Sequence, residues 1–297
     1  MNKAEHIILI AFLFCAAAIA TLKAQPEKEF RIFKYQGIER LYYFYMPKKL
    51  SKEAPLVFMM HAIGGNYNEY YNKLIEMGQR DGFAVCVPFG MPSTDSQKRT
   101  GQWNCHYEYQ SSDTIDDVGF VNELAKFLQK KYKLNPLNTF CTGHSTGGDF
   151  CFIMAHDPRN IFTAFAPVSG CILEDFYKSH SLPHPLPILL CHGTNDPSIP
   201  WNGDPTDEKK YGNFISVWQA TNYWVTANRC TNEIISQLPV RNRKIVCHRF
   251  IGGAKAFEGG PDAEVRLYEV VNGGHGWPDE DMDTYEVIWK FFKMYLR

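Results

Sequence analysis

The segment at residues 139–154 constrains the fold of this chain more than any other part of the sequence. An apolar run at 139–142 is followed by Gly-His-Ser-Thr-Gly at 143–147 and then by an apolar stretch at 152–154 with helical character. Small residues two positions before and after Ser145 permit a sharp strand-to-helix turn that exposes the serine hydroxyl. The pattern predicts that strands and helices alternate, and that Ser145 is a candidate nucleophile.

The rest of the sequence repeats this alternation. Apolar runs typical of strands buried on both faces occur at 55–60, 83–87, 163–168, 187–191 and 265–271. Segments with helical spacing occur at 69–80, 117–132, 213–228 and 283–296. The alternation predicts the α/β class, with a mostly parallel central sheet and helices on both faces.

Three segments depart from the alternation. Residues 30–35 and 40–45 read as two strands around a Gln-Gly turn, and they predict an antiparallel edge. Residues 88–114 have no period and many Pro, Gly, Ser and Asp residues, so we expect a long surface loop, a kind of segment that is often functional. Between Gly170 and Pro187 the chain is too short for a helical lid, so no large lid is expected.

The first 24 residues are predicted to be a signal peptide, and residues 25–297 one catalytic domain. Lys3 supplies a positive charge, residues 7–20 are apolar, and Leu-Lys-Ala at 22–24 is a plausible cleavage site. About 14 apolar residues fall short of the roughly 20 that span a bilayer, although an N-terminal membrane anchor is the alternative. The sequence therefore predicts a secreted or periplasmic protein that has no membrane contact after cleavage.

Charge excludes some partners. The chain has 31 Lys and Arg against 32 Asp and Glu, a formal net charge of −1, and no long run of either sign. Nucleic acid and anionic membrane surfaces are therefore not expected as partners.

A serine hydroxyl needs a neighbouring base, and in strand-turn-helix sites of this kind the order along the chain is Ser, acid, His. His180, His184 and His192 come too early, and His248 lies in an alternating strand-like run. His275 lies in a glycine-rich loop directly after a strand and is the predicted general base. Its alternative is a turn histidine with no partner.

Asp196 is the predicted acid that holds the histidine in the correct tautomer. It follows the apolar run 187–191 in the segment Cys-His-Gly-Thr-Asn-Asp-Pro at 191–197. Asp204 and Asp207 compete with it, but they lie in a polar, turn-rich stretch that is more typical of solvent. A plain turn aspartate is the other interpretation of Asp196.

Acyl transfer also requires donors for the oxyanion of the tetrahedral intermediate, and backbone amides serve because they are fixed before reaction. We expect the amide of Thr146 and that of Ile63, which follows the run 55–60. His-Gly is usual at the second turn, whereas this chain has Ala62 after His61, and alanine tolerates positive φ less well than glycine.

Nine cysteines are present, of which Cys15 lies in the predicted signal peptide. The remaining eight allow 105 complete pairings, and several lie in apolar runs where a buried free thiol is the simpler interpretation. Cys230 and Cys247 are close enough in sequence to predict one disulfide in an exported protein.

The chain resembles the polyhydroxybutyrate depolymerases and feruloyl esterases of carbohydrate esterase family 1, from about Phe30 to Arg297. The motifs that carry the resemblance are Pro-Leu-Val at 55–57, Asp-Val-Gly-Phe-Val at 117–121, Gly-His-Ser-Thr-Gly-Gly at 143–148, Ala-Pro-Val-Ser-Gly at 166–170, His-Gly-Thr-Asn-Asp-Pro at 192–197 and Gly-His-Gly-Trp-Pro at 274–278. The resemblance implies the α/β-hydrolase fold, a triad of Ser145, Asp196 and His275, and no metal or organic cofactor. Thr146 stands where asparagine is common in the family, which a backbone donor tolerates.

These observations together predict a secreted serine carboxylic-ester hydrolase that acts on feruloyl or acetyl esters of plant polysaccharide. A polyester depolymerase is the nearest alternative, and a catalytically silent carbohydrate-binding relative is an alternative from another class. Trp103, Trp201 and Trp277 lie in loops expected near the serine, where they could bind a sugar or phenolic ring by stacking, or pack in the core.

Overall fold

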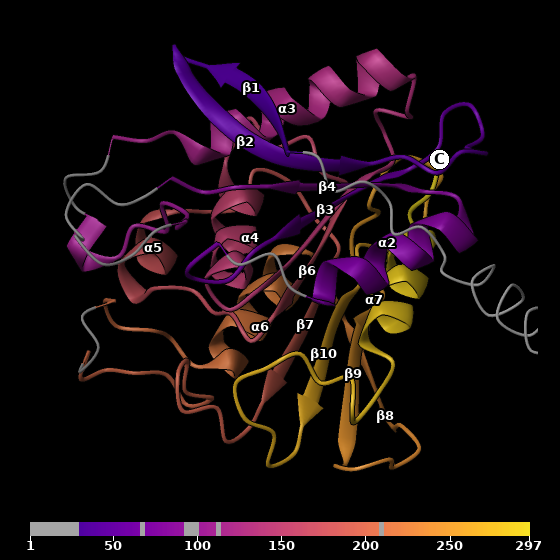
Figure 1. The fold of residues 1–297 in the computed structure, drawn as a ribbon. Helices are drawn as coiled ribbons and strands as arrows, with labels where there is room; N and C mark the ends of the chain where they lie inside the picture. The colour runs from indigo at the N-terminus through magenta and orange to yellow at the C-terminus, as the bar shows by residue number, and fades with distance from the viewer. Residues whose placement is uncertain (1–29, 66–68, 92–100, 111–113, 208–210) are drawn as a thin grey trace, which may run out of the picture. The chain divides into compact units, whose positions relative to one another are not determined.

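The computed structural model describes residues 30–65, 69–91, 101–110, 114–207 and 211–297. Residues 31–297 form one compact unit built around a ten-stranded sheet, with strand order β1-β2-β4-β3-β5-β6-β7-β10-β9-β8 (Figure 1). The predicted signal peptide lies outside the described residues. Within the described part of the chain, no helix has the length and apolar character needed to cross a bilayer.

The centre of the sheet is parallel. Six neighbouring strands run in the same direction, because β3 pairs in parallel with β4 and β5, and β6, β7 and β10 follow in the same sense. These strands are β3 (Leu56–Met60), β4 (Ala84–Pro88), β5 (Thr139–His144), β6 (Ala164–Val168), β7 (Ile188–Gly193) and β10 (Val265–Val270). Every residue of β3, β4 and β6 is buried, as apolar runs covered on both faces require.

Antiparallel strands extend the sheet on both sides. At one edge β1 (Phe30–Tyr35) lies beside β2 (Ile38–Tyr45), which pairs antiparallel with β4, so the predicted edge is confirmed. At the other edge β9 (Ile245–Ile251) pairs with β10, and β8 (Asn232–Gln237) pairs with β9, both antiparallel. β8 could not be predicted from the sequence, because all six of its residues are exposed and leave no apolar period.

Helices cover both faces. On one face, α3 (Asp117–Tyr132), α4 (Thr146–His156), α5 (Glu174–Ser179) and α6 (Val217–Ala227) contribute Phe120, Phe152, Phe176 and Trp224 to one hydrophobic core. On the other face, α2 (Glu69–Asp81) and α7 (Thr284–Lys293) contribute Leu74 and Trp289 to a second core. A short 3-10 helix lies at Glu108–Gln110. The predicted α/β architecture is therefore confirmed.

The start of α3 and the short connection between β6 and β7 both shape the part of the sheet near Ser145. Asp116 caps α3, since its side chain accepts a hydrogen bond from the Gly119 amide at 2.9 Å. Between Gly170 and Pro187 the structure places only the six-residue helix α5, so no large lid covers this part of the sheet.

Candidate active site

Ser145 lies at the sharp turn between β5 and α4. Its backbone adopts φ 57° and ψ −123°, a left-handed φ that few non-glycine residues accept. A Cβ on Gly143 would collide with the Gly147 carbonyl, and a Cβ on Gly147 would collide with the Met60 and His61 carbonyl oxygens. The two glycines are therefore required by close backbone approach, as the sequence motif predicts.

The structure brings the three predicted polar residues into one hydrogen-bonded chain. The Ser145 Oγ lies 2.8 Å from His275 Nε2, and His275 Nδ1 lies 2.8 Å from Asp196 Oδ2. They follow β5, β10 and β7 respectively, and the carboxyl ends of parallel strands meet at one edge of a sheet. Residues that are 130 positions apart in sequence therefore meet in space.

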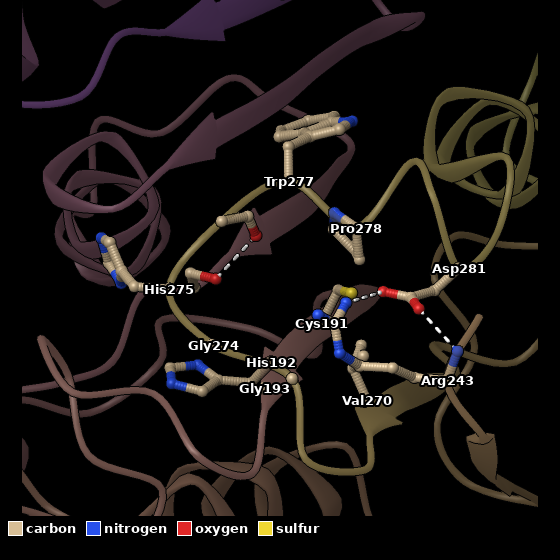
Figure 2. Close-up of a pocket in the computed structure, with 13 residues that line it drawn as sticks. Cys191, His192, Gly193, Arg243, Val270, Gly274, His275, Trp277, Pro278 and Asp281 are labelled. Atoms are coloured by element: carbon tan, nitrogen blue, oxygen red, sulfur yellow. Dashed lines mark hydrogen bonds and ion pairs between the residues drawn. The ribbon is translucent and has the colours of Figure 1, made fainter.

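The loop that carries His275 is fixed by backbone contacts. The Asn195 amide donates to the Gly273 carbonyl at 2.9 Å, and the Ser169 hydroxyl donates to the Gly276 carbonyl at 3.0 Å. Figure 2 shows the His275 imidazole and the Trp277 indole extending in different directions from this loop. The same loop lines a cavity of about 210 Å³ together with Cys191. The imidazole is therefore aimed at Ser145 by the loop backbone.

Asp196 is held as a carboxylate. Its Oδ1 accepts hydrogen bonds from the Ser198 and Ile199 amides at 2.8 and 2.9 Å, which leaves Oδ2 for His275. Burial raises the pKa of this carboxyl, but the hydrogen bond from His275 and the charge of that ring lower it, and the net pKa lies below the ordinary value.

His192 is a further residue of this site, and the sequence analysis rejected it as a base because it precedes Asp196. Its Nε2 lies 2.8 Å from the Ile199 carbonyl, an acceptor only, so this nitrogen carries the proton. The same nitrogen is 3.4 Å from Asp196 Oδ2. Burial lowers the pKa of His192, so its ring is neutral, and it lies next to the Asp196 carboxylate. Its i, i+4 spacing to Asp196 at the end of a strand was the available signal.

The two predicted oxyanion donors lie at the start of α4 and after β3. Thr146 is the first residue of α4, where amides have no partner within the helix. Ile63 lies in the loop after β3, in which the left-handed positions are Gly64 and Gly65, with φ 95° and 64°. The φ of Ala62 is not positive, so alanine in place of the usual glycine causes no backbone strain here.

Comparison with known proteins supplies the family. The sequence model of the Esterase family matches residues 36–249, which is well over half of the chain. The chain belongs to the Esterase family.

Individual relatives of this Esterase family member are distant. Feruloyl esterase B of Piromyces equi is 24% identical over 252 residues, which cover 82% of this chain and 43% of that protein. The bifunctional acetylxylan esterase/xylanase XynS20E of Neocallimastix patriciarum is 26% identical over 163 residues, 54% of this chain and 22% of that protein. The chain thus spans less than half the length of either relative.

Solved structures agree on the fold. An acetyl xylan esterase from Aspergillus awamori superposes with a TM-score of 0.59 at 13% identity, over 90% of this chain and 99% of that one. A thermostable esterase superposes with a TM-score of 0.54 at 18% identity. The predicted α/β-hydrolase fold is confirmed.

Two of the three tryptophans predicted to bind substrate are buried in this Esterase family member. Trp103 is 0% exposed, donates from Nε1 to the His61 carbonyl at 3.0 Å and stacks on Phe150. Trp277 is 7% exposed and packs against Tyr285. The Trp103 ring is fully enclosed, so that prediction is wrong, whereas Trp277 lines the cavity beside His275 and stays a prediction. Trp201 is partly exposed and stays a candidate.

The predicted Cys230–Cys247 disulfide is also wrong, because both residues are free thiols. Cys247 belongs to the core on one face of the sheet, whereas Cys230 packs against the core on the other face. The Thr231 amide bonds the Ile251 carbonyl, so Cys230 lies beside the far end of β9. Four residue-to-residue steps along the strand lead from Ile251 to Cys247, roughly 13 Å at 3.3 Å per step, which is too far for a disulfide.

The first turn of α4 contains a buried acid that the sequence analysis missed. Asp149 is 3% exposed, and its Oδ2 accepts from the Tyr107 hydroxyl at 2.5 Å while its Oδ1 accepts from the Cys171 amide at 2.8 Å. Burial raises the pKa of Asp149 to about 7. The carboxyl therefore joins the long loop and the β6 loop to the helix that begins beside Ser145.

Among the described residues, no group of His, Cys, Asp and Glu is arranged to hold a metal ion.

Asp149→Asn is expected to flatten the dependence of stability on pH. The folded protein keeps this proton up to about pH 7, whereas the unfolded chain releases it near the ordinary value of 3.8. The contribution of the protonated Asp149 carboxyl to the free energy of unfolding is complete below the pKa of the unfolded chain, 3.8. It falls by about 1.4 kcal/mol per pH unit above that value, and it is lost as the pH rises through the folded-state pKa of about 7. Asparagine can keep both hydrogen bonds without a charge.

The check is the melting temperature between pH 5 and pH 8.5, with Asp175→Asn on the exposed side of α5 as the control. The wild type and the control should lose more melting temperature with rising pH than Asp149→Asn does. Parallel curves for all three proteins would show that Asp149 ionises normally.

Proposed function

We propose that this protein is a serine carboxylic-ester hydrolase that acts on acetyl or feruloyl esters of plant polysaccharide. The observation that carries the proposal is the hydrogen-bonded chain from Ser145 Oγ through His275 to Asp196. The names of the relatives, feruloyl esterase and acetylxylan esterase, supply the substrate class.

The geometry suits a two-step acyl transfer. As Ser145 Oγ bonds to the carbonyl carbon of the ester, His275 Nε2 takes the serine proton, and the carbonyl oxygen becomes an oxyanion. The amides of Thr146 and Ile63 stabilise that oxyanion. His275 then gives its proton to the departing alcohol oxygen, which leaves an acyl-serine. Water, deprotonated by the same nitrogen, then attacks the acyl carbon. The bond from that carbon to Ser145 Oγ breaks, Oγ takes the proton from His275 Nε2, and the acid is released.

Asp196 acts through His275. Its carboxylate accepts a hydrogen bond from Nδ1–H, which keeps the ring proton on Nδ1 and leaves Nε2 free to accept the proton of Ser145. The carboxylate also stabilises the imidazolium that exists while the tetrahedral intermediates form and collapse. Since the pKa of Asp196 lies below its ordinary value, this charge is present at neutral pH.

The sheet edge suits an ester attached to a bulky alcohol. Only the short helix α5 lies between β6 and β7, where a lid would otherwise cover the serine. Trp201 follows the Asp196 loop, is partly exposed, and forms an edge contact with Trp218 at 6.4 Å between ring centroids. An indole in this position can stack on a sugar ring. Export through residues 1–24 as a signal peptide would place the protein where such polymers are found.

The substrate proposal predicts a strong preference for small or aryl acids. We expect kcat/KM for methyl ferulate and p-nitrophenyl acetate to exceed that for p-nitrophenyl palmitate by about 100-fold or more, because a site without a lid offers little apolar wall to a long chain. Acetylated xylan and hydroxybutyrate oligomers complete the panel, with Ser145→Ala as the blank. Equal rates on the palmitate would reveal an acyl tunnel, and a preference for hydroxybutyrate oligomers would assign polyester as the substrate.

A further inference from the structure

His61 is a buried histidine at the end of β3 that the acyl-transfer mechanism does not use. It is 1% exposed, and its ring is stacked on the Trp103 indole at 4.8 Å between centroids. Its Nε2 accepts a hydrogen bond from the Gly90 amide at 2.9 Å. Because a backbone amide can only donate, Nε2 carries no proton, and the proton of the neutral ring is on Nδ1. Burial lowers the pKa of His61 to about 4, so the ring stays neutral at physiological pH.

The Nδ1–H group donates to the carbonyl oxygen of Ala62, at 2.7 Å. The amide of Gly65 also donates to this oxygen, at 3.3 Å. In a trans peptide the carbonyl of one residue and the amide of the next point in opposite directions. The ring that holds the Ala62 oxygen therefore fixes the direction of the Ile63 N–H, which points away from His61.

His61 is itself anchored on both sides. The Trp103 Nε1 donates to the His61 carbonyl at 3.0 Å, and the backbone at Gly90 lies so close to Gln102 that a Cβ there would collide with its carbonyl. A Cβ on Gly147 would collide with the Met60 and His61 carbonyl oxygens, so the backbone at the end of β3 lies close against the turn that carries Ser145. The imidazole of His61 therefore connects the closely packed backbone at Gly90 to the Ala62–Ile63 peptide, which lies near the turn that carries Ser145.

We propose that His61 is a positioning residue, which holds the Ala62–Ile63 peptide so that the Ile63 amide faces the oxyanion. The inference rests on the proposed function. The Thr146 amide needs no such support, because α4 fixes it, whereas the Ile63 amide lies on a loop. Among the described residues, the Ile63 amide has no backbone acceptor, as a donor reserved for substrate requires.

Two carboxamide variants separate the two hydrogen bonds of the ring. In His61→Asn the side-chain amide nitrogen lies near the former Nδ1 and can still donate to the Ala62 oxygen. In His61→Gln the longer side chain reaches the former Nε2 position and can accept from Gly90, but leaves the Ala62 oxygen without its donor. Both remove the imidazole from the same pocket, so loss of packing affects them alike.

We expect His61→Gln to lower kcat on p-nitrophenyl acetate by about 10- to 100-fold with KM within about threefold, since a full oxyanion donor is worth 10²- to 10³-fold. His61→Asn should keep kcat within about fivefold of the wild type. The second readout is the ratio of rates on p-nitrophenyl acetate and its thionoester. Sulfur accepts hydrogen bonds weakly, so a misplaced donor should shrink this ratio in His61→Gln and not in His61→Asn.

Equal losses on ester and thionoester, or equal activity of the two variants, would overturn the role of His61 while the wild type still hydrolyses esters. A wild type that neither turns over an ester nor reacts with a fluorophosphonate would instead overturn the proposed function. The ring nitrogens of wild-type His61, observed by ¹⁵N NMR, give a test that needs no variant to fold. A protonated Nδ1 and a bare Nε2 support the proposal, and a protonated Nε2 contradicts it.

Discussion

Ser145→Ala is expected to lower kcat for ester hydrolysis by roughly 10⁵-fold or more, with the protein still folded. Without Oγ no acyl-serine forms, and His275 Nε2 has no hydroxyl to deprotonate. His275→Ala should cost about as much, and the double variant little more, because the two residues act as one unit. Turnover of p-nitrophenyl acetate and covalent labelling by a fluorophosphonate are the measurements.

His184→Ala is the matched control, because His184 is an exposed histidine in the segment before β7. It should keep wild-type turnover, and circular dichroism should show all the variants folded. A folded Ser145→Ala protein with near-normal turnover would end the proposed mechanism. Absence of labelling in the wild type would favour a silent carbohydrate-binding relative.

Asp196→Asn is expected to lower kcat at neutral pH by about 10⁴-fold through a change of tautomer. The Ser198 and Ile199 amides donate to Oδ1, so they hold the oxygen of the new side chain and turn its NH₂ group toward His275. Nδ1 must then accept, the ring proton moves to Nε2, and that nitrogen can no longer take the proton of Ser145.

Asp204→Asn is the control for this prediction, since Asp204 competes for the role of acid in the sequence and its carboxylate accepts hydrogen bonds from its own turn, such as that from the Thr206 amide. It should leave kcat unchanged, and the ¹⁵N shifts of His275 should show the altered tautomer in Asp196→Asn alone. If the two variants behave alike, Asp196 does not orient His275.

The arrangement of Ser145, His275 and Asp196 was predictable because it depends on order along the chain and on buried strands. Apolar runs mark β5, β7 and β10 in the sequence, and the loops that follow them supply Ser145, Asp196 and His275. Parallel pairing then brings their carboxyl ends to one edge without any further information. The strand-to-helix turn at Ser145 was predictable from its glycines for the same local reason.

Side-chain environment was harder to predict than topology. Trp103 lies in a segment without periodicity, and its burial depends on His61 and Phe150, each more than 40 positions away in sequence. Asp149 reads as an ordinary first-turn acid of a helix, and only the approach of Tyr107 shows that it is enclosed. Cys230 and Cys247 are close in sequence, but the face of the sheet that each thiol meets follows from tertiary packing.

The order of Ser145 and His275 along the chain bears on biosynthesis. Ser145 is translated long before β10, yet its partner comes from the loop after that strand, and β10 must insert between β7 and β9. A nascent chain that has not released β10 and the loop after it from the ribosome therefore holds Ser145 without its base. Because β10 is synthesised after the nine other strands of the described sheet, the appearance of hydrolytic activity would report the completion of that sheet.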